Sequence, residues 1–202
     1  MIKVYIEKES FNQDEEFITF SGQYSNENFY IGPAESDDYD DNTREFLYEF
    51  LRGQSIFPVY IVFEPYSDVA ERTISTLEKA HIQHTCIQNK VNSKKQTILK
   101  VVVKDDKKLK FLLEEFFWFA ASNQFFSVSF SDNCSYHLVT RKGFIGKNRA
   151  YMIPNFHMHS NSTVITIFHD GFGVNIYSND SKFSSIDNLA KSFPPNVEID
   201  SN

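Results

Sequence analysis

The sequence predicts an α+β fold: antiparallel sheet with a split β-α-β-β-α-β (ferredoxin-like) centre, flanked by additional N- and C-terminal strands and short helices. Over residues 57–131, apolar residues are spaced as in strands and as in helices in successive segments, in the order β-α-β-β-α-β. Short runs rich in β-branched and aromatic residues precede and follow this segment. No Gly- or Pro-rich linker divides the 202 residues, so we expect a single α+β domain over residues 1–202.

Residues 1–56 are predicted to form an acidic segment with the order β-β-β-α. Three short strands are expected at residues 2–6, 17–20 and 29–31. Asn42 and Glu45 have the spacing of a capping box, which typically opens a helix. One face of that helix would carry Phe46, Leu47, Phe50 and Leu51. Gly53 is expected to end it.

Residues 57–131 are predicted to form the split βαβ unit. Its four strands are expected at residues 59–63, 85–88, 97–103 and 125–130. Asp68 and Glu71 again have the capping-box spacing, and Asp105 or Asp106 is expected to cap the second helix. That helix has a one-sided apolar stripe of Leu109, Leu112, Leu113, Phe116, Phe117 and Ala120. Trp118 and Phe119 fall outside the stripe, so they either contact a further layer of the fold or form an exposed pair for a partner.

Residues 132–202 are predicted to form a β-rich segment with a C-terminal helix. Its strands are expected at residues 136–140, 150–153, 163–169 and 172–177. Asp170-Gly171 is a tight-turn signal between the last two strands. Residues 184–187 are expected to open the last helix, with inward-facing residues Ile186, Leu189, Ala190 and Phe193. Pro194-Pro195 would end it.

Charge is distributed unevenly along the chain. The whole chain carries −7, whereas the stretch from Glu9 to Phe50 contains twelve acids and one base, Arg44, and carries −11. The remainder therefore carries +4. An acidic lobe on a weakly basic body indicates a surface that binds something basic, although a solvated loop would have the same composition.

The acidic stretch predicts a non-catalytic protein-binding function, of the inhibitor or immunity (antitoxin-like) type, with a basic partner such as a nuclease-type toxin. The carboxylates expected to bind the partner are those of Glu35, Asp37, Asp38, Asp40 and Asp41. Tyr39, in the middle of the run, is expected to be an aromatic anchor. A regulatory small-ligand-binding domain is a further alternative, because split βαβ units can pair and bind ligands between them.

A metal-dependent enzyme using a histidine cluster is the other alternative. His157 and His159 would point to one side of a strand, and His169 would lie on the next strand. Three imidazoles plus the Asp170 carboxylate would suit Zn²⁺ with an open coordination position, although Asp170 is better explained as the turn residue. However, Pro154-Asn155 and Ser160-Asn161-Ser162 flank the pair, which favours a loop there.

Other functional classes have weak support in the sequence. No apolar run approaches the roughly 18 residues of a membrane span, and neither a secretory signal nor a catalytic or cofactor motif is recognisable. Eight lysines between Lys90 and Lys110 could contact phosphates, but the corresponding strand lacks the exposed aromatics of an RNA-binding sheet. Two cysteines, Cys86 and Cys134, are too few for a disulfide framework. We therefore expect a cytoplasmic protein without cofactor, and nucleic-acid binding is not favoured.

Overall fold

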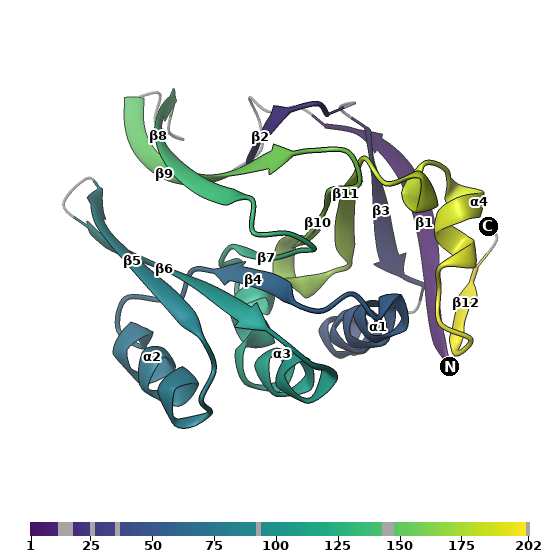
Figure 1. Cartoon of the computed structure of the whole chain (residues 1–202), viewed down its shortest axis with the longest axis horizontal. Helices are drawn as coiled ribbons and strands as arrows, with labels where there is room; N and C mark the ends of the chain where they lie inside the picture. The colour runs from purple at the N-terminus through teal and green to yellow at the C-terminus, as the bar shows by residue number, and fades with distance from the viewer. Residues whose placement is uncertain (12–17, 25–26, 35–36, 92–93, 143–147, 201–202) are drawn as a thin grey trace.

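The computed structural model describes residues 1–11, 18–24, 27–34, 37–91, 94–142 and 148–200. Within these residues the chain forms a mixed α+β fold with four α-helices and two sheets (Figure 1). The α+β class predicted from the sequence is confirmed.

The larger sheet has nine strands in the order β12-β1-β3-β11-β10-β7-β4-β6-β5. Its strands in chain order are β1 (Ile2–Ser10), β3 (Glu27–Pro33), β4 (Val59–Phe63), β5 (His84–Val91), β6 (Lys94–Val103), β7 (Phe126–Ser129), β10 (Thr163–Ile167), β11 (Val174–Ser178) and β12 (Val197–Ile199). Neighbouring strands are antiparallel except β1 and β12, which are parallel. Strands from the beginning, middle and end of the chain are therefore hydrogen-bonded into one sheet.

The smaller sheet has three strands, in the order β2-β9-β8. They are β2 (Thr19–Gly22), β8 (Cys134–Lys142) and β9 (Asn148–Met158). Strand β9 pairs antiparallel with β8 and parallel with β2. This sheet lies over one face of the nine-stranded sheet, on the side away from the first three helices (Figure 1).

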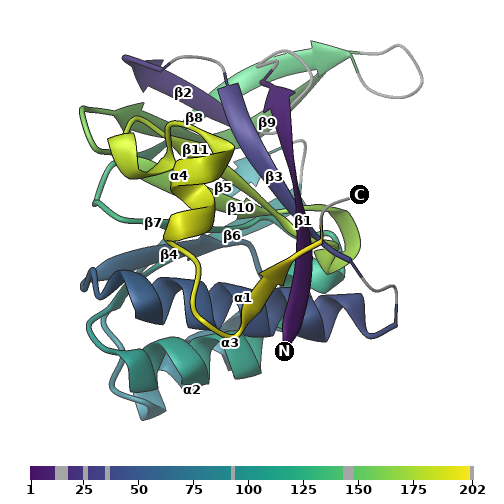
Figure 2. The same ribbon diagram turned by 90° about the vertical axis from the view of Figure 1, so that its right-hand side faces the viewer.

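The helices are α1 (Tyr39–Gln54), α2 (Ala70–Lys79), α3 (Asp106–Ala121) and α4 (Ile186–Lys191), with 3₁₀ turns η1 (His169–Gly171) and η2 (Ser181–Phe183). Helices α1, α2 and α3 lie on the same face of the nine-stranded sheet (Figure 2). Helix α4 lies beside β1, where Leu189 and Phe183 enter the core next to Phe50 of α1. The molecule is therefore layered as helices, large sheet and small sheet.

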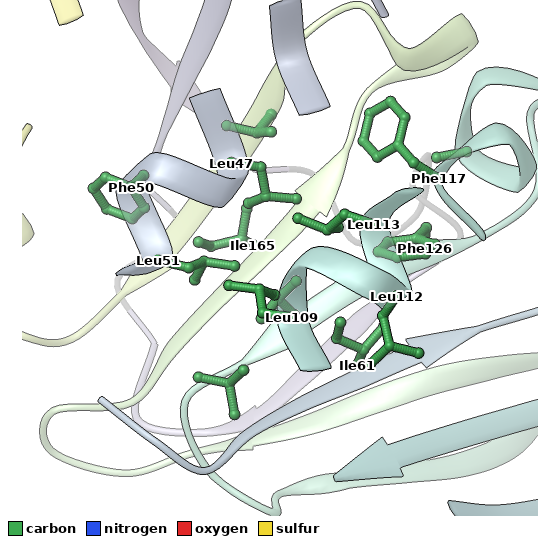
Figure 3. Packing of buried hydrophobic residues seen from close by; sticks show 14 of the residues in the cluster. Leu47, Phe50, Leu51, Ile61, Leu109, Leu112, Leu113, Phe117, Phe126 and Ile165 are labelled. Carbon is green, nitrogen blue, oxygen red and sulfur yellow. The ribbon is translucent and has the colours of Figure 1, made fainter. Parts of the chain in front are cut away.

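Two hydrophobic clusters hold the layers together. The larger one joins α1 and α3 to the nine-stranded sheet, and Figure 3 shows Leu47 and Leu51 of α1 near Leu109 and Leu113 of α3. The smaller one lies between the two sheets and contains Phe11, Ile18, Phe20, Phe156, Met158, Val164 and Tyr177. Successive side chains of a strand point to opposite faces, so β10 contributes Ile165 to the larger cluster and Val164 to the smaller one.

The predicted apolar stripe of α3 is confirmed, since all six of its residues are buried. The predicted cap of that helix is confirmed too, because the Asp105 carboxylate accepts a hydrogen bond from Lys108 N at 2.8 Å. The Asp170-Gly171 turn is confirmed by the antiparallel pairing of β10 with β11. All three features are encoded by residues close together in the chain.

The two predicted capping boxes are wrong. Helix α1 begins at Tyr39 rather than after Asn42, and its N-cap Asp38 has left-handed backbone angles (φ 56°, ψ 40°). An aspartate tolerates this conformation, and the partial positive charge at the helix start favours Asp40 and Asp41 in the first turn. At α2 the N-cap position is taken by Val69, so Asp68 lies one residue too early to cap.

Two expectations for the C-terminal segment also need correction. His157 belongs to strand β9, not to a loop, because β9 continues through Pro154 and Asn155 by pairing with β2 and β8. Ile186 was expected to face inward, but its side chain is 40% exposed while Leu189 is buried. Helix α4 is only six residues long and buries one narrow stripe.

Candidate functional site

The carboxylates predicted to bind a partner lie at the start of α1. Asp37 and Asp38 are exposed in the turn before the helix, and Asp40 and Asp41 occupy its first turn. Arg44 forms an ion pair with Asp41 at 2.8 Å. Glu35, the remaining predicted carboxylate, lies outside the described residues.

Tyr39 is half-buried and packs against the chain itself. Its ring lies 5.1 Å from that of Phe172, centroid to centroid. Phe172 directly follows η1, the turn between β10 and β11. The aromatic residue predicted as an anchor for a partner therefore joins the start of α1 to η1.

Turn η1 lies between the start of α1 and the end of α3. Gly171 has φ +76°, and a Cβ atom at this position would lie 3.2 Å from Asp40 Cβ and 3.4 Å from Ala121 Cα. On the α1 side, Gly173 N donates a hydrogen bond to Thr43 Oγ1 at 2.9 Å. The chain therefore brings η1 against residues from two helices that are more than 40 positions away in the sequence.

Asn123, just after α3, holds the exposed side of η1. Its Oδ1 accepts a hydrogen bond from Asp170 N at 2.9 Å and lies 3.0 Å from His169 Nδ1. Its Nδ2 donates to Asp170 Oδ1. Asp170 is thus an exposed, oriented carboxylate one residue from the contact with Asp40. In the sequence, Asp170 is explained as a turn residue, and no signal there groups it with the acidic run at residues 37–41.

Two exposed aromatic rings lie on the elements that meet at η1. Phe168, immediately before η1, is 40% exposed and packs edge-on against Tyr30 at 5.2 Å. On α3, Trp118 is 44% exposed and stacks on Tyr66 at 6.1 Å. The Tyr66 hydroxyl donates to Ser122 O at 2.6 Å, next to Asn123.

We call this region the acidic–aromatic surface. It comprises Asp37, Asp38, Asp40, Asp41, Tyr66, Trp118, Phe168, His169 and Asp170. Of the two residues that fall outside the α3 stripe, Phe119 is 1% exposed and belongs to the core, whereas Trp118 belongs to this surface. The surface combines carboxylates with oriented aromatic rings, and such a combination suits a basic protein partner.

The structure separates the predicted histidine cluster into two places. The rings of His157 and His159 lie 4.4 Å apart, and His157 Nδ1 lies 3.1 Å from Ser21 Oγ. His157 and His159 come before the start of β10, whereas His169 comes after its end and contacts Asn123. Within the described residues, no group of three or more His, Cys, Asp or Glu side chains is arranged to hold a metal ion.

Two lysines of the predicted basic run, Lys100 and Lys108, contact groups other than the acidic carboxylates. Lys100 forms an ion pair with Asp132 at 2.6 Å, and Lys108 Nζ donates to Ala80 O at 2.5 Å. Lys108 lies at the start of α3, whereas the end of α3 contacts η1. The two charge clusters therefore lie at opposite ends of this helix.

A partly buried carboxyl group, that of Glu64, lies where the two sheets meet. Glu64 Oε2 accepts a hydrogen bond from Gln96 Nε2 at 2.9 Å, and the same amide donates to Met152 O of β9 at 3.1 Å. Burial raises the pKa of Glu64 to about 7. Sequence position alone shows only a polar residue after a buried strand, so no sequence signal identified it.

Comparison with known proteins yields no relative: no protein family model, no curated protein and no solved structure matches this chain. Among the residues that the structure describes, no helix is both long enough and apolar enough to cross a membrane. Both cysteines are free thiols, Cys86 being exposed and Cys134 partly buried.

Proposed function

We propose that this protein is a non-catalytic protein-binding protein, and that its acidic–aromatic surface binds a basic partner protein. The observation that carries the proposal is the approach of η1 to the start of α1, where Gly171 lies against Asp40, together with the exposed rings of Phe168 and Trp118 on the adjoining elements. An inhibitor of the immunity type, directed against a nuclease-type toxin, is the specific form that we favour. Nuclease sites present lysine and arginine to phosphates, and a dense carboxylate surface can occupy such a site.

The arrangement of the surface supports this proposal in two ways. The carboxylates would steer a basic partner toward the surface, which raises the association rate and makes it depend on salt. The aromatic rings would contribute the apolar contacts that dominate the affinity of most interfaces. Asn123 already orients Asp170, and Tyr39 already packs against Phe172, so little conformational freedom is lost on binding.

The test is capture of a partner from native extract by the immobilised protein at low salt. A wash at ~0.5 M salt screens charge interactions beyond a few ångströms, and the released proteins are identified by mass spectrometry. The proposal expects a dominant basic protein in this fraction. The affinity of the purified pair is then measured at several salt concentrations.

A charge-neutralising variant assigns the binding to the proposed surface. The four-fold variant Asp37→Asn, Asp38→Asn, Asp40→Asn and Asp41→Asn keeps the side-chain shape, and asparagine tolerates the left-handed backbone of residue 38. We expect at least ~10-fold weaker binding at low salt, since the steering and ion-pair contributions are lost. Circular dichroism checks that the variant is folded.

The matched control removes the same number of charges elsewhere. Glu71, Glu78, Glu114 and Glu115 are exposed on α2 and α3, and each is replaced by glutamine. Equal weakening in both four-fold variants would show that net charge alone matters and would contradict the proposed surface. Failure of the extract to yield any salt-released basic protein would contradict the proposed function itself.

We also propose that β4, α2, β5, β6, α3 and β7 form a split β-α-β-β-α-β unit embedded in the wider sheet. Their adjacency in the order β7-β4-β6-β5, with both helices on one face, supports this assignment. The cytosolic location expected from the cysteine content is part of the same proposal, and the two free thiols are compatible with it.

A further inference from the structure

Glu64 lies where the two sheets meet. Glu64 directly follows β4 of the nine-stranded sheet, and its carboxyl group accepts a hydrogen bond from Gln96 of β6. The other hydrogen bond of the Gln96 amide goes to Met152 O in the three-stranded sheet. A single amide therefore links the carboxyl group to the backbone of the opposite layer.

Among the described residues, the Gln96 amide is the one group observed to donate a hydrogen bond to this carboxyl group. Strand β8 places Tyr136 near Glu64, and its buried hydroxyl has no hydrogen-bond partner among the described residues. Cys134 of the same strand is partly buried and lies near Tyr136. The charged groups of this region, Lys100 of β6 and Asp132, form an ion pair with each other at 2.6 Å. An ionised Glu64 would consequently keep only the Gln96 amide as its observed donor.

Among these neighbours, Glu64 is the group that titrates near neutral pH. Burial raises the pKa of Cys134 to about 12, and burial together with the nearby Cys134 and Glu64 raises the pKa of Tyr136 well above its ordinary value. Both remain neutral below pH 9. Burial raises the pKa of Glu64 itself from 4.5 to about 7, and the Gln96 hydrogen bond opposes this only in part.

We propose that Glu64 is a pH-sensitive switch, and that its ionisation loosens the β2-β9-β8 sheet from the nine-stranded sheet. A carboxylate between two layers gains solvation when the layers separate, whereas a neutral carboxyl group gains little. The closed arrangement is thus favoured below neutral pH, and opening is favoured above it. Opening would expose the apolar residues between the sheets, among them Phe20 and Phe156. This inference does not depend on the proposed partner.

Cys134 is a natural reporter of opening, because it packs against the cluster between the sheets. The experiment uses the full chain with Cys86→Ser, which removes the exposed thiol, and compares it with the same chain carrying Glu64→Gln. The labelling rate of Cys134 by a small disulfide reagent is measured from pH 5 to pH 8. Taking the ratio of the two rates at each pH cancels the intrinsic pH dependence of the thiol.

We expect this ratio to rise on the order of 50-fold between pH 5 and pH 8. The carboxyl group of Glu64 keeps its proton to higher pH in the closed state than in the open state, so raising the pH favours opening. A control chain carrying Glu115→Gln, an exposed glutamate of α3, should behave like the Cys86→Ser chain. A ratio that does not change with pH would overturn the proposal.

Hydrogen exchange followed by mass spectrometry provides a second measurement that needs no Glu64 variant. In the unmodified chain, amide exchange in β9 is compared with exchange in α3 at the same pH values. A ratio of β9 to α3 exchange that rises above neutral pH supports local loosening of the small sheet. An equal rise in both elements would indicate global unfolding and would overturn the proposal.

Discussion

Gly171 shows how a single residue allows three parts of the chain to meet. It has φ +76°, a conformation that L-residues with a Cβ adopt at a cost, and it lies against both Asp40 and Ala121. Gly53, in the last turn of α1, is different, because an added Cβ would meet nothing within 4 Å. The same residue type is therefore required at one position and dispensable at the other.

We predict opposite effects on stability from alanine at these two glycines. Gly171→Ala should lower the free energy of unfolding by about 1–3 kcal/mol, because it adds backbone strain and crowds Ala121. Gly53→Ala should raise it by about 0.5–1 kcal/mol, because alanine has the higher helix propensity. Urea denaturation of both variants measures the difference. A stabilised Gly171→Ala would contradict the assigned turn geometry.

At the scale of the element, helices α2 and α3 are each preceded by an aspartate, but only one of these aspartates caps its helix. Both are preceded by aspartates with plausible cap spacing, at Asp68 and Asp105. Asp105 has extended backbone angles and its side chain accepts from Lys108 N, whereas the N-cap of α2 is Val69 and has no side-chain cap. The two helices therefore begin at different positions relative to their aspartates.

Alanine substitution should separate the two aspartates. Asp105→Ala should lower the free energy of unfolding by about 1 kcal/mol, because Lys108 N loses its acceptor. Asp68→Ala should change it by less than about 0.5 kcal/mol, since an exposed residue without a cap bond contributes little. Thermal or urea denaturation under identical conditions checks the pair. Equal losses would mean that Asp68 caps α2 in solution.

At the scale of the whole molecule, the two ends of α1 lie near side chains of opposite charge. Asp37 and Asp38 precede the helix, while a groove of about 810 Å³ near its end is lined by cationic residues together with Glu49. Those cationic residues are Arg52, Lys182 and Lys191. The 16-residue helix spans roughly 24 Å, so the acidic surface lies well beyond the Debye length from this groove.

The layered architecture also determines how stability depends on pH. The folded-state pKa of Glu64 is raised from 4.5 to about 7, so its contribution to stability is fully present below pH 4.5 and is lost as pH rises through 7. Glu64→Gln should remove this dependence. At pH 8 the variant should exceed the unmodified protein by up to about 3 kcal/mol in free energy of unfolding.

Urea denaturation at pH 4.5, 6 and 8 tests this prediction. The exposed-site variant Glu115→Gln serves as the control and should follow the unmodified protein at every pH. If Glu64→Gln is less stable than the unmodified protein at pH 8, then the carboxylate is stabilised between the sheets rather than destabilised.

Local features of the fold follow from residues that are near one another in sequence. The i, i+3, i+4 spacing from Leu109 to Ala120 is sufficient to predict the buried face of α3, because a helix repeats every 3.6 residues. The Asp170-Gly171 signal is sufficient to predict the turn between β10 and β11. The acidic run at Asp37–Asp41 is likewise visible as composition, since charge does not depend on the fold.

Long-range contacts determine the strand order, the packing of the layers and the burial of polar groups, because these depend on partners that local periodicity does not specify. Strand β11 could pair with β3, and Gly171 could lie against Asp40, only once the chain had folded. Partial burial of Glu64 where the sheets meet has the same origin, since its exposure depends on β8 and β9, which begin 70 and 84 residues later. Composition and periodicity therefore establish the α+β class, the individual helices and the acidic run, whereas the tertiary structure alone decides which strands are neighbours and which polar groups are buried.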